Sequence, residues 1–464
     1  MVANDLELAI DEIVRQQNIA GRRVSVGLSG GCDSVCLLEV LARIASRYEI
    51  DLTAVHVNHG ISGKSDDWES FCRDLSKSLK VNFESQKVLV NLKSGRGVEE
   101  TARESRYGFF SNLSTDFIFL AHHLDDQVET FFLQLLRGAG VSGLSAMPRV
   151  RTPWGFKGPK LIRPWLFVER KLIVDYATHK KLSWVEDESN LDQSLDRNFL
   201  RISVLPTISN RYPGYRNCVH RTIQNIGDSE YLIGQLGEID KHSIMDGEPG
   251  LNLYRLSKLT DKRIINLLRY IFFENGYRYP RRNLIQEVVR QLFEAKNDSQ
   301  INFIINGVCL RRYRNRLYFS ENKEYGVVDF SEVWTGQEEI TLPNNQGSLS
   351  FNKSFGVGLS CQKIQNKLLT VRFRKGGEKM VYGRAGAKRT LKNLFQEAGI
   401  PPWLRNSMPL IFCDGELAWI PAIGYSKKFI STNHDLSVSI RWDSLPYSKN
   451  TNLDFQYTRG HIDA

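Results

Sequence analysis

Several common features are missing from this chain of 464 residues, and each absence excludes a class of protein. No apolar run approaches the ~18 residues that a membrane-spanning helix needs, so an integral membrane protein is not expected. The seven cysteines are scattered and include no Cys-x-x-Cys pair, which disfavours a zinc ribbon or an iron–sulfur site. The amino-terminal residues also lack the basic start and apolar core of a signal peptide. We therefore expect a cytoplasmic protein whose thiols stay reduced.

Positive charge is what the chain has in excess, and it is concentrated near the carboxyl end. The formal net charge is +10. Between positions 363 and 405, eleven basic residues stand against two acidic ones, a local excess of +9. Tyr382, Phe395 and Trp403 interleave with the basic residues. A solvated basic face would have the same charge, but the added aromatic side chains favour contacts with the backbone and bases of a nucleic acid.

The first half of the chain has the pattern of an α/β domain. A chain of this length is expected to form two or three cores. Residues 1–215 alternate strand and helix patterns, which predicts a doubly wound parallel sheet. The expected strands are 24–28, 52–58, 82–90 and 116–121, and the expected helices are 34–47, 66–80, 97–112 and 124–137. Ligands of such sheets bind beyond the carboxyl ends of the strands.

The second part of the chain has a different pattern. Residues 216–320 have helical periodicity over 219–237 and 261–273, which predicts a mainly helical domain. A basic, aromatic segment at 311–316 closes this domain and resembles a hairpin. Residues 321–360 are polar and rich in glycine, asparagine and serine, which indicates a linker or edge strands.

The basic region belongs to a third part. Residues 361–445 are predicted to form a small α+β domain, with strands at 368–373 and 417–420 around a helix at 388–398. Residues 446–464 are expected to be a tail. The fold class is therefore an α/β domain followed by a mainly helical domain and a small basic α+β domain.

A short loop after the first expected strand is the most informative segment of the chain. It contains Ser29, Gly30, Gly31, Cys32, Asp33 and Ser34. Two glycines let successive backbone N–H groups converge, and the helix that follows adds the positive end of its dipole. No lysine follows the glycines, so this is not the Gly-x-x-x-x-Gly-Lys-Ser/Thr loop. A carboxylate at Asp33 is compatible with a polyphosphate only if a cation bridges the two. The segment predicts a cradle for a metal-bound pyrophosphate.

The second expected strand ends in Val-His-Val-Asn-His-Gly at 55–60. In a parallel sheet this end lies beside the first loop and would face the adenine and ribose of a nucleotide. His56 is either a nucleotide contact or a satisfied core histidine. Asn58 and His59 are either ligand contacts or turn residues.

A third constellation lies where the strand at 116–121 leads into a helix. It contains His122, His123, Asp125, Asp126 and Glu129. Acids are common in a first helical turn because of the macrodipole, but that does not explain two preceding histidines. The spacing suits a pocket in which Asp125, Asp126 and Glu129 hold a cationic amine while a histidine or carboxylate accepts its proton. The pattern lacks the two histidines, four apart, of helical zinc motifs, so an ammonium site is favoured over a metal.

Two further stretches supply arginines. Arg103 and Arg106 are three apart on the helix that precedes the histidine strand. A polar loop at 186–192 leads to Arg197 and Arg201. These side chains suit charge neutralisation at a phosphate, although a salt-bridged surface loop would have a similar composition.

The order of these motifs resembles that of the tRNA(Ile)-lysidine synthetases, a family of PP-loop ATP pyrophosphatases. The similar segments are Leu-Ser-Gly-Gly-Cys-Asp-Ser, Val-His-Val-Asn-His-Gly, Glu-x-x-Ala-Arg-x-x-Arg-Tyr, His-His-x-Asp-Asp-Gln-x-Glu-Thr, Arg-Pro-Trp-Leu at 163–166 and Glu-Asp-x-Ser-Asn-x-Asp…Arg-Asn-x-x-Arg. Residues 391–405 are similar to the last domain of the family. Two positions depart from it, because Ala121 stands where a glycine is common and Trp165 where a leucine is usual.

The resemblance implies an enzyme that joins free L-lysine to the wobble cytidine in the CAU anticodon of a minor isoleucine tRNA. ATP would adenylate the cytosine with release of pyrophosphate, and the ε-amine of lysine would then displace AMP. The product, lysidine, changes the codon read from AUG to AUA. The cofactors implied are ATP and Mg²⁺, with Asp33 as the metal ligand. A monomer or a homodimer is expected.

The resemblance also distributes roles among the residues. Catalytic roles are implied for Asp33, Arg103, Arg106, His122, His123, Asp125, Asp126 and Arg201. ATP contacts are implied for Ser29, Gly30, Gly31, Cys32, Asp33, Ser34, His56 and Asn58. Lysine contacts are implied for Asp125, Asp126 and Glu129. Contacts with tRNA are implied for Arg197, Lys388, Arg389, Lys392, Trp403 and Arg405.

Three other functions compete with this interpretation. A tRNA cytidine 2-thiolase on the same sheet would rely on cysteine pairs, which the sequence lacks. An amidotransferase-type ligase would need a glutaminase nucleophile, for which no motif is present. A non-catalytic tRNA-binding protein would explain the basic region but would leave the histidine and carboxylate cluster without a role.

Overall fold

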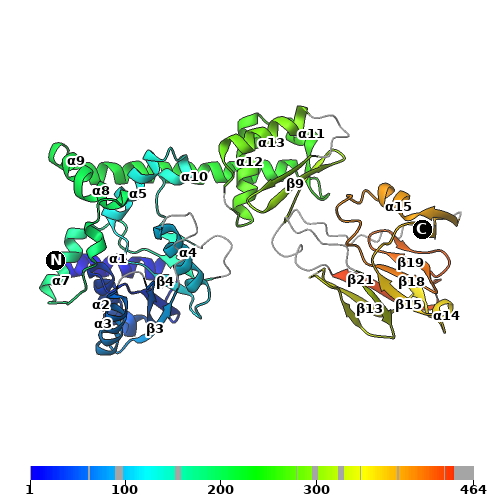
Figure 1. Cartoon of the computed structure of the whole chain (residues 1–464), viewed down its shortest axis with the longest axis horizontal. Helices are drawn as coiled ribbons and strands as arrows, with labels where there is room; N and C mark the ends of the chain where they lie inside the picture. Colours follow the sequence, from blue (N-terminus) through cyan, green and yellow to red (C-terminus); the bar gives the residue numbers. More distant parts are fainter. Residues whose placement is uncertain are drawn as a thin grey trace. The chain divides into compact units, whose positions relative to one another are not determined.

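The computed structural model of the chain describes residues 2–60, 63–88, 98–151, 158–277, 279–294, 301–321, 329–344, 346–383, 386–432 and 434–443. The chain divides into two compact units, Met1–Leu236 and Gly237–Ala464 (Figure 1). The expected tail at 446–464, the end of the expected strand at 89–90, the first residue of the expected helix at 97 and the basic residue Arg384 lie outside the described residues.

Unit 1 is built on a six-stranded sheet in the order β3-β2-β1-β4-β6-β5. Its parallel strands are β1 (Arg23–Gly27), β2 (Asp51–Asn58), β3 (Asn82–Lys87), β4 (Phe117–Phe119) and β6 (Lys160–Ile162). The short edge strand β5 (Val150–Arg151) runs antiparallel to β6. The predicted α/β domain with a doubly wound parallel sheet is confirmed.

Helices cover both faces of this sheet. They are α1 (Val2–Gln16), α2 (Cys32–Ala45), α3 (Ser65–Ser78), α4 (Val98–Ser111), α5 (Leu124–Leu136) and α7 (Arg170–His179). Because side chains alternate along a strand, Val26 and Phe119 join the core that contains α1, α2 and α7. Val55 and Ile118 point the other way and pack with Phe110 of α4. Burial on both faces explains why all three residues of β4 are apolar.

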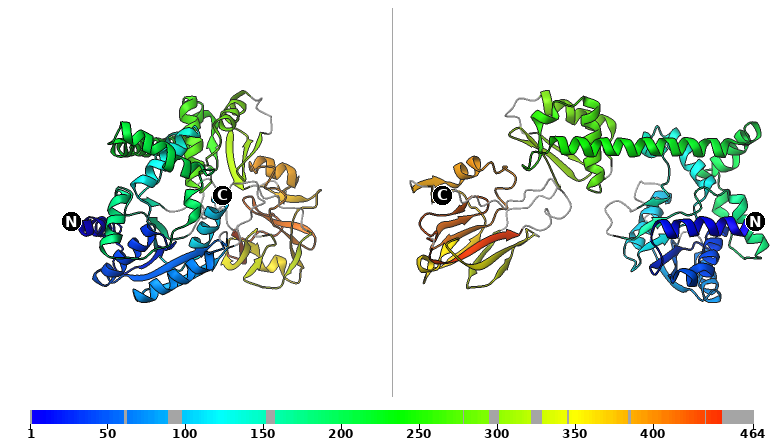
Figure 2. Two further views of the ribbon diagram at one scale, coloured as in Figure 1. Left: turned by 60° about the vertical axis from the view of Figure 1, so that its left-hand side comes forward. Right: turned by 180° about the vertical axis from the view of Figure 1, so that it is seen from behind.

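Shorter elements complete unit 1. They are a 3₁₀ turn at Ser46–Tyr48, α6 (Val141–Leu144), a second 3₁₀ turn at Glu188–Leu191, α8 (Asp196–Phe199), a π-helical turn at Leu200–Val204 and α9 (Leu205–Arg211). The long helix α10 (Tyr215–Ile244) begins in unit 1 and ends in unit 2, and it is the long green helix in the right-hand view of Figure 2. Among the described residues, no helix has the length and apolar character that crossing a membrane requires.

The first part of unit 2 packs helices on a small sheet. The helices are α11 (Leu253–Leu256), α12 (Asp261–Glu274) and α13 (Arg282–Glu294). The antiparallel sheet has the order β7-β10-β9-β8, with β7 (Leu251–Asn252), β8 (Asn302–Ile305), β9 (Val308–Tyr313) and β10 (Arg316–Glu321). The basic hairpin expected at 311–316 comprises the end of β9, the turn at 314–315 and the first residue of β10.

The second part of unit 2 contains two antiparallel sheets and a hairpin. One sheet has β11 (Ser331–Trp334), β15 (Leu369–Arg372), β18 (Leu410–Cys413), β19 (Glu416–Ile420) and β20 (Gly424–Tyr425). The other has β12 (Glu339–Thr341), β13 (Ser348–Phe355), β21 (Leu436–Asp443) and β14 (Leu359–Ser360), which is followed by α14 (Cys361–Ile364). Strands from 331–360 therefore pair with strands from 369–443, and β13 lies inside its sheet rather than at the edge.

The helix expected at 388–398 begins later than predicted. Lys388 and Arg389 lie in β17 (Ala387–Thr390), which forms a hairpin with β16 (Lys379–Tyr382). Helix α15 (Leu391–Glu397) starts only after Thr390, whose side chain accepts a 3.3 Å hydrogen bond from the backbone N–H of Asn393. This N-cap fixes the start of the helix and leaves the two basic residues on a strand.

Gly30 has a conformation and a position that no other residue type can adopt without strain. Its φ is +89°, in the left-handed region. A Cβ atom at this position would stand 2.8 Å from Cγ2 of Val185 and 3.3 Å from Sγ of Cys72. Gly31 differs, since it precedes α2 with a φ of −73° and the nearest atom to its Cβ position is Ser29 Oγ at 3.6 Å.

We predict that Gly30→Ala destabilises unit 1 by about 1–2 kcal/mol or more, because left-handed strain and a steric clash combine. Gly31→Ala is the matched control and should change stability by less than ~0.5 kcal/mol. Thermal melting in the absence of ATP measures both. Equal melting temperatures for the two variants would contradict this account of the loop.

Candidate active site

The polar residues predicted as a site lie at the carboxyl ends of the strands of unit 1. The loop after β1 is closed by its own serine side chains: Ser29 N–H donates to Ser34 Oγ at 3.2 Å, and Ser34 Oγ donates to the Gly31 carbonyl at 3.0 Å. The carbonyl of Gly30 accepts a 3.0 Å bond from Val185 N–H. The loop conformation is thus set without a ligand, and its backbone stays at the amino end of α2, where an anion is stabilised.

Asp33 lies in the first turn of α2 and is the acid of this loop. Its Oδ1 is buried, accepts no hydrogen bond, and lies 3.5 Å from Nε of Arg170. Among the described residues, no group of three or more histidine, cysteine or acidic side chains is arranged to hold a metal ion. An ion here would need other ligands, and Mg²⁺ characteristically takes them from one or two carboxylates and substrate phosphates. The Oδ1 of Asp33, which accepts no hydrogen bond, fits that donor set.

His123 connects the loop to the predicted amine pocket. It is 3% exposed, and its Nε2 lies 3.8 Å from Oδ2 of Asp33 and 3.4 Å from Oδ2 of Asp126. Burial lowers the pKa of His123, but Asp126, Asp33 and Asp125 together raise it above its ordinary value. Its Nδ1 also caps α5 by accepting a long 3.4 Å bond from Asp126 N–H. Protonation would exchange this weak cap for an ion pair with Asp125, whose Oδ2 lies 3.9 Å from Nδ1.

The pKa of the neighbouring His122 is shifted in the opposite direction. Its Nδ1 is buried without a hydrogen-bond partner. Burial lowers the pKa of His122 to about 3, and Arg163, Arg197 and Arg103 lower it while Asp126 opposes them. His122 is therefore a neutral imidazole near pH 7, whereas the carboxylates around His123 shift its pKa in the opposite direction.

The predicted lysine-binding carboxylates are already paired with arginines. Glu129 is 1% exposed and binds two of them: its Oε2 accepts from Arg197 Nε at 2.7 Å, and its Oε1 accepts from Arg201 Nε at 2.6 Å. Asp126 accepts a 3.0 Å bond from Nη2 of Arg197. Burial raises the pKa of Asp126, but the neighbouring His123 and Arg197 bring it down to about 2. Arg197, expected to contact tRNA, is thus placed to hold these two carboxylates.

Asp125 has a separate set of partners. It accepts a 2.6 Å bond from Nε of Arg216, on α10, and a 3.0 Å bond from the backbone N–H of Arg170. Arg170 therefore contacts both Asp33 and Asp125. No motif pointed to Arg170 or Arg216, because they lie 45 and 91 residues beyond Asp125 in the sequence.

The end of β2 is held by internal contacts. His56 is 5% exposed and its Nδ1 lies 2.8 Å from the Leu28 carbonyl, as in the alternative of a satisfied core histidine. Asn58 donates to Asp66 at 2.8 Å and to Glu69 at 3.1 Å, and it accepts from Gly60 N–H at 3.0 Å. These contacts form a turn. His59 differs, since its buried Nδ1 has no partner and burial lowers its pKa to about 4.

The predicted arginines of α4 lie beside a tyrosine. Arg103 is exposed and donates a 3.2 Å bond from Nη2 to the Tyr107 hydroxyl. Arg106 is also exposed, and its charge contributes to the low pKa of His59. Both arginines therefore lie at the same end of the sheet as the histidines. Tyr107, Arg151 and Arg163 join them there, and no motif had assigned these three residues a role.

The expected tRNA-binding residues of unit 2 fall into two groups. Lys388 and Lys392 are exposed, while Arg389 forms an ion pair with Glu397. Trp403 packs edge-on against Tyr318, with ring centroids 5.6 Å apart, and Arg311 lies 5.3 Å from its ring centroid. Arg405 donates to the Ile400 carbonyl at 2.9 Å and to the Tyr313 hydroxyl at 3.2 Å. Trp403 and Arg405 therefore make contacts within unit 2 in the absence of any ligand.

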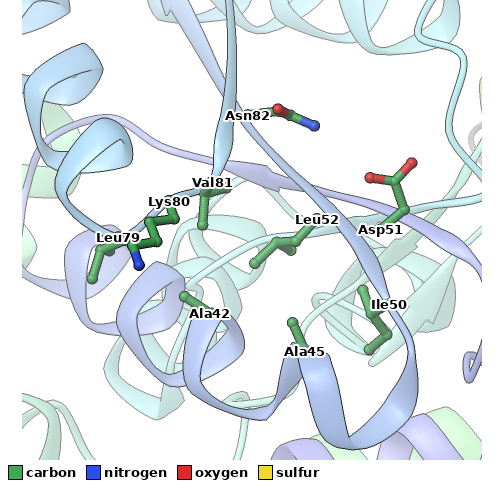
Figure 3. Close-up of a pocket in the computed structure, with 9 residues that line it drawn as sticks. All are labelled: Ala42, Ala45, Ile50, Asp51, Leu52, Leu79, Lys80, Val81 and Asn82. Carbon is green, nitrogen blue, oxygen red and sulfur yellow. The ribbon is translucent and has the colours of Figure 1, made fainter.

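A cavity of about 250 Å³ lies at the opposite end of the sheet and contains none of the predicted site residues. It is lined by Ala42, Ala45, Ile50, Asp51, Leu52, Leu79, Lys80, Val81 and Asn82 (Figure 3). Asp51 and Asn82 begin β2 and β3, so the cavity is at the amino ends of the strands. Parallel sheets bind their substrates at the other end.

Comparison with known proteins gives matches over most of the chain. Residues 3–208 match the family described as "PP-loop domain", residues 251–318 match "TilS substrate binding domain", and residues 369–442 match "TilS substrate C-terminal domain". Among solved structures, the U34-tRNA thiolase NcsA from Methanococcus maripaludis is similar with a TM-score of 0.43 and 17% identity, over 48% of this chain and 79% of that chain.

Curated relatives match at higher identity. The tRNA(Ile)-lysidine synthase of Nitrosomonas europaea is 38% identical over 429 residues, which is 92% of this chain and 93% of the relative. The tRNA(Ile)-lysidine synthase of Coxiella burnetii is 35% identical, over 86% of this chain and 88% of the relative. With its PP-loop domain, both TilS domains and relatives that match almost end to end, the chain belongs to the tRNA(Ile)-lysidine synthase family.

Proposed function

We propose that this protein ligates L-lysine to the wobble cytidine in the CAU anticodon of a minor isoleucine tRNA, using ATP and Mg²⁺. The observation that carries the proposal is the arrangement around Asp33. A pyrophosphate-type loop, a carboxylate with an oxygen that accepts no hydrogen bond, a histidine among carboxylates and a neutral histidine lie together at one edge of the sheet. This arrangement supports one active site for adenylation and for attack by an amine.

In the adenylation step, the cytosine carbonyl oxygen attacks the α-phosphate of ATP and pyrophosphate leaves. The backbone N–H groups of the loop after β1 and the amino end of α2 would bind the pyrophosphate. Mg²⁺, when bound, neutralises charge on the phosphates, and Asp33 would hold it through Oδ1. Arg170, whose Nε lies 3.5 Å from Oδ1 of Asp33, and Arg201, which interacts electrostatically with Asp33, are cations close to this step. They would offset charge that develops on the leaving group.

In the second step, the ε-amine of lysine attacks the activated ring carbon, and AMP leaves. A protonated amine is not a nucleophile, so a neighbouring group must accept a proton. We assign to His122 the removal of a proton from the attacking nitrogen as the new bond forms, because its Nδ1 has no partner and its ring is neutral near pH 7. Its low pKa makes it too weak a base for the free ammonium group, whose nitrogen becomes far more acidic once it bonds to the ring carbon. His123 is unsuited, since its position among three carboxylates favours the protonated form.

The ammonium form of lysine would first be held by carboxylates. Asp126 is the best placed of the three predicted acids, because it lies beside both histidines and remains ionised. Glu129 is buried between Arg197 and Arg201 and would act by positioning those arginines. Free lysine, ATP and tRNA occur together in the cytoplasm, where the seven unpaired cysteines would remain reduced.

The direct test of the function is transfer of labelled L-lysine to RNA. We expect incorporation into a single isoleucine-accepting tRNA species with the CAU anticodon, with release of AMP and pyrophosphate in equal amounts. Reactions without ATP or with methionine tRNA are the controls. Release of pyrophosphate without incorporation of lysine would contradict the proposal, and so would incorporation of sulfur.

Asp33→Ala should lower the rate of ATP-dependent pyrophosphate release roughly 100-fold or more, because the Mg²⁺ that neutralises charge on the phosphates loses its protein ligand. Raising the Mg²⁺ concentration should restore part of the activity if Asp33 binds the ion. Asp51→Ala is the matched control, since Asp51 is exposed at the other end of the same sheet (Figure 3). Initial rates across an Mg²⁺ series measure the effect. An unchanged Mg²⁺ dependence in Asp33→Ala would remove the metal role.

Replacing Lys388, Arg389 and Lys392 together by glutamine should weaken tRNA binding and flatten its salt dependence. The log–log slope should fall by roughly 0.9 for each duplex phosphate contact that is lost. The two exposed lysines should account for most of the change, because Arg389 already has Glu397 as a partner. Filter binding over a salt series measures the slope.

The control for this charge change is the triple glutamine variant of Lys77, Lys80 and Lys181, which are exposed lysines of unit 1. It removes the same formal charge and should leave the slope unchanged. The affinity for ATP should be unchanged in both triple variants. If the two variants bind tRNA equally well, the segment around β17 is only a solvated basic face.

A further inference from the structure

Arg163 is a buried charge without a counter-ion among the described residues. It follows β6 directly and is 0% exposed. Its Nη1 donates a 2.9 Å hydrogen bond to the Pro148 carbonyl. Its Nε and Nη2 are buried and make no hydrogen bond of good geometry, and the Tyr107 side chain is the one polar, uncharged neighbour that acts on the guanidinium. These two atoms lie on the same edge of the guanidinium, so the unsatisfied donors form one fork.

The groups around this fork are mostly cationic. Tyr107, Arg151 and Arg103 act on Arg163, and none of them is an acid. Burial raises the pKa of Tyr107, yet the four arginines Arg103, Arg163, Arg151 and Arg106 bring it below its ordinary value. An arginine stays charged in proteins, and a buried unpaired charge is costly. The described part of the chain thus holds positive charge here without a carboxylate in contact with the fork.

The geometry of the Nε–Nη2 edge of Arg163 indicates which ligand it would bind. The Nε–Nη2 edge of a guanidinium presents two parallel N–H groups, which match two oxygens of a carboxylate or a phosphate. A water molecule has only one oxygen and would leave the charge uncompensated. The site therefore fits an oxyanion that binds through two oxygens.

We propose that Arg163 is the anchor of an oxyanion subsite and that its occupant is the α-carboxylate of the lysine substrate. This proposal rests on the proposed function. His122 is near both charged groups, since both Arg163 and Asp126 act on it. Lysine carries a carboxylate at one end and an ammonium group at the other, six bonds away. Arg163 would bind the first, and Asp126 would bind the second beside His122.

Entry of the carboxylate requires a local shift, because the two donors have no contact with solvent in this structure. The Tyr107 side chain lies next to Arg163, and its hydroxyl accepts a 3.2 Å bond from the exposed Arg103. Rotation of Tyr107 with Arg103 would open the fork without any change in the sheet. The shift is favourable because a carboxylate gives the Arg163 charge a full opposite charge, whereas the neighbouring Tyr107 hydroxyl offers only a dipole.

The test compares L-lysine with 1,5-diaminopentane, which is lysine without its carboxylate, in the wild type and in Arg163→Lys. Lysine at this position keeps the charge and one donor for the Pro148 carbonyl but cannot present a fork. In the wild type, the KM for the diamine should exceed that for lysine roughly tenfold or more. In Arg163→Lys, the KM for lysine should rise toward that of the diamine, while the KM values for the diamine and for tRNA stay unchanged.

Arg149→Lys is the matched control, because Arg149 is also largely buried but has an acidic partner, Glu12, at 2.9 Å. It should retain the wild-type preference for lysine over the diamine. Thermal melting gives a readout that does not depend on turnover. Saturating lysine should raise the melting temperature of the wild type and of Arg149→Lys more than that of Arg163→Lys.

The outcomes separate this proposal from the proposed function. If the wild type incorporates labelled lysine but Arg163→Lys raises the KM for lysine and the diamine equally, only the subsite is refuted. A rise confined to the KM for tRNA would assign the fork to a nucleotide phosphate and would also overturn the carboxylate. If Arg163→Lys does not fold, the wild type alone decides with L-lysinamide, because equal KM values for lysine and lysinamide would refute the subsite.

Discussion

Compensation of buried charge is the constraint on which the site of unit 1 depends. Four carboxylates, Asp33, Asp125, Asp126 and Glu129, converge with four arginines, Arg170, Arg197, Arg201 and Arg216, around His123. An acidic side chain as buried as Glu129 is rarely found without a partner. The arginines come from four different elements, so the charges can be neutralised only when α5, α7, α8, the π-helical turn and α10 pack together. Folding of this unit and formation of its site are thus a single event.

The sheet was predictable from the sequence because its signals are local. Short apolar segments mark β1, β2 and β4, and the paired glycines after β1 mark the turn into α2. His122, His123 and the acids of α5 could be assigned to one site because they adjoin in sequence. Arg170 and Arg216 could not, since nothing near them in the sequence distinguishes them from surface arginines. The partners of His56 were equally invisible, because its contact is with the backbone carbonyl of Leu28, 28 residues away.

The start of α15 shows that a single N-cap residue can determine where a helix begins. The run from Lys388 to Ala398 has good helix formers, and composition alone favours a helix throughout. Thr390 nevertheless caps the helix, and the pairing of β17 with β16 takes up the residues before it. The basic residues of this region consequently differ in their surroundings. Lys388 lies on strand β17 and Lys392 on helix α15, whereas Arg389 forms an ion pair with Glu397.

The contact between Gly30 and Val185 has a consequence for how such a loop can evolve. The carbonyl of Gly30 accepts from Val185 N–H, and the Val185 side chain fills the space where a Cβ would stand. Val185 introduces the segment that carries Arg197 and Arg201. The phosphate cradle and the arginines therefore share one mechanical support, although more than 150 residues separate them in the chain. Grafting the Ser-Gly-Gly loop alone onto another parallel sheet would transfer its sequence but not its backbone conformation. The loop and the segment that begins at Val185 must therefore be conserved together.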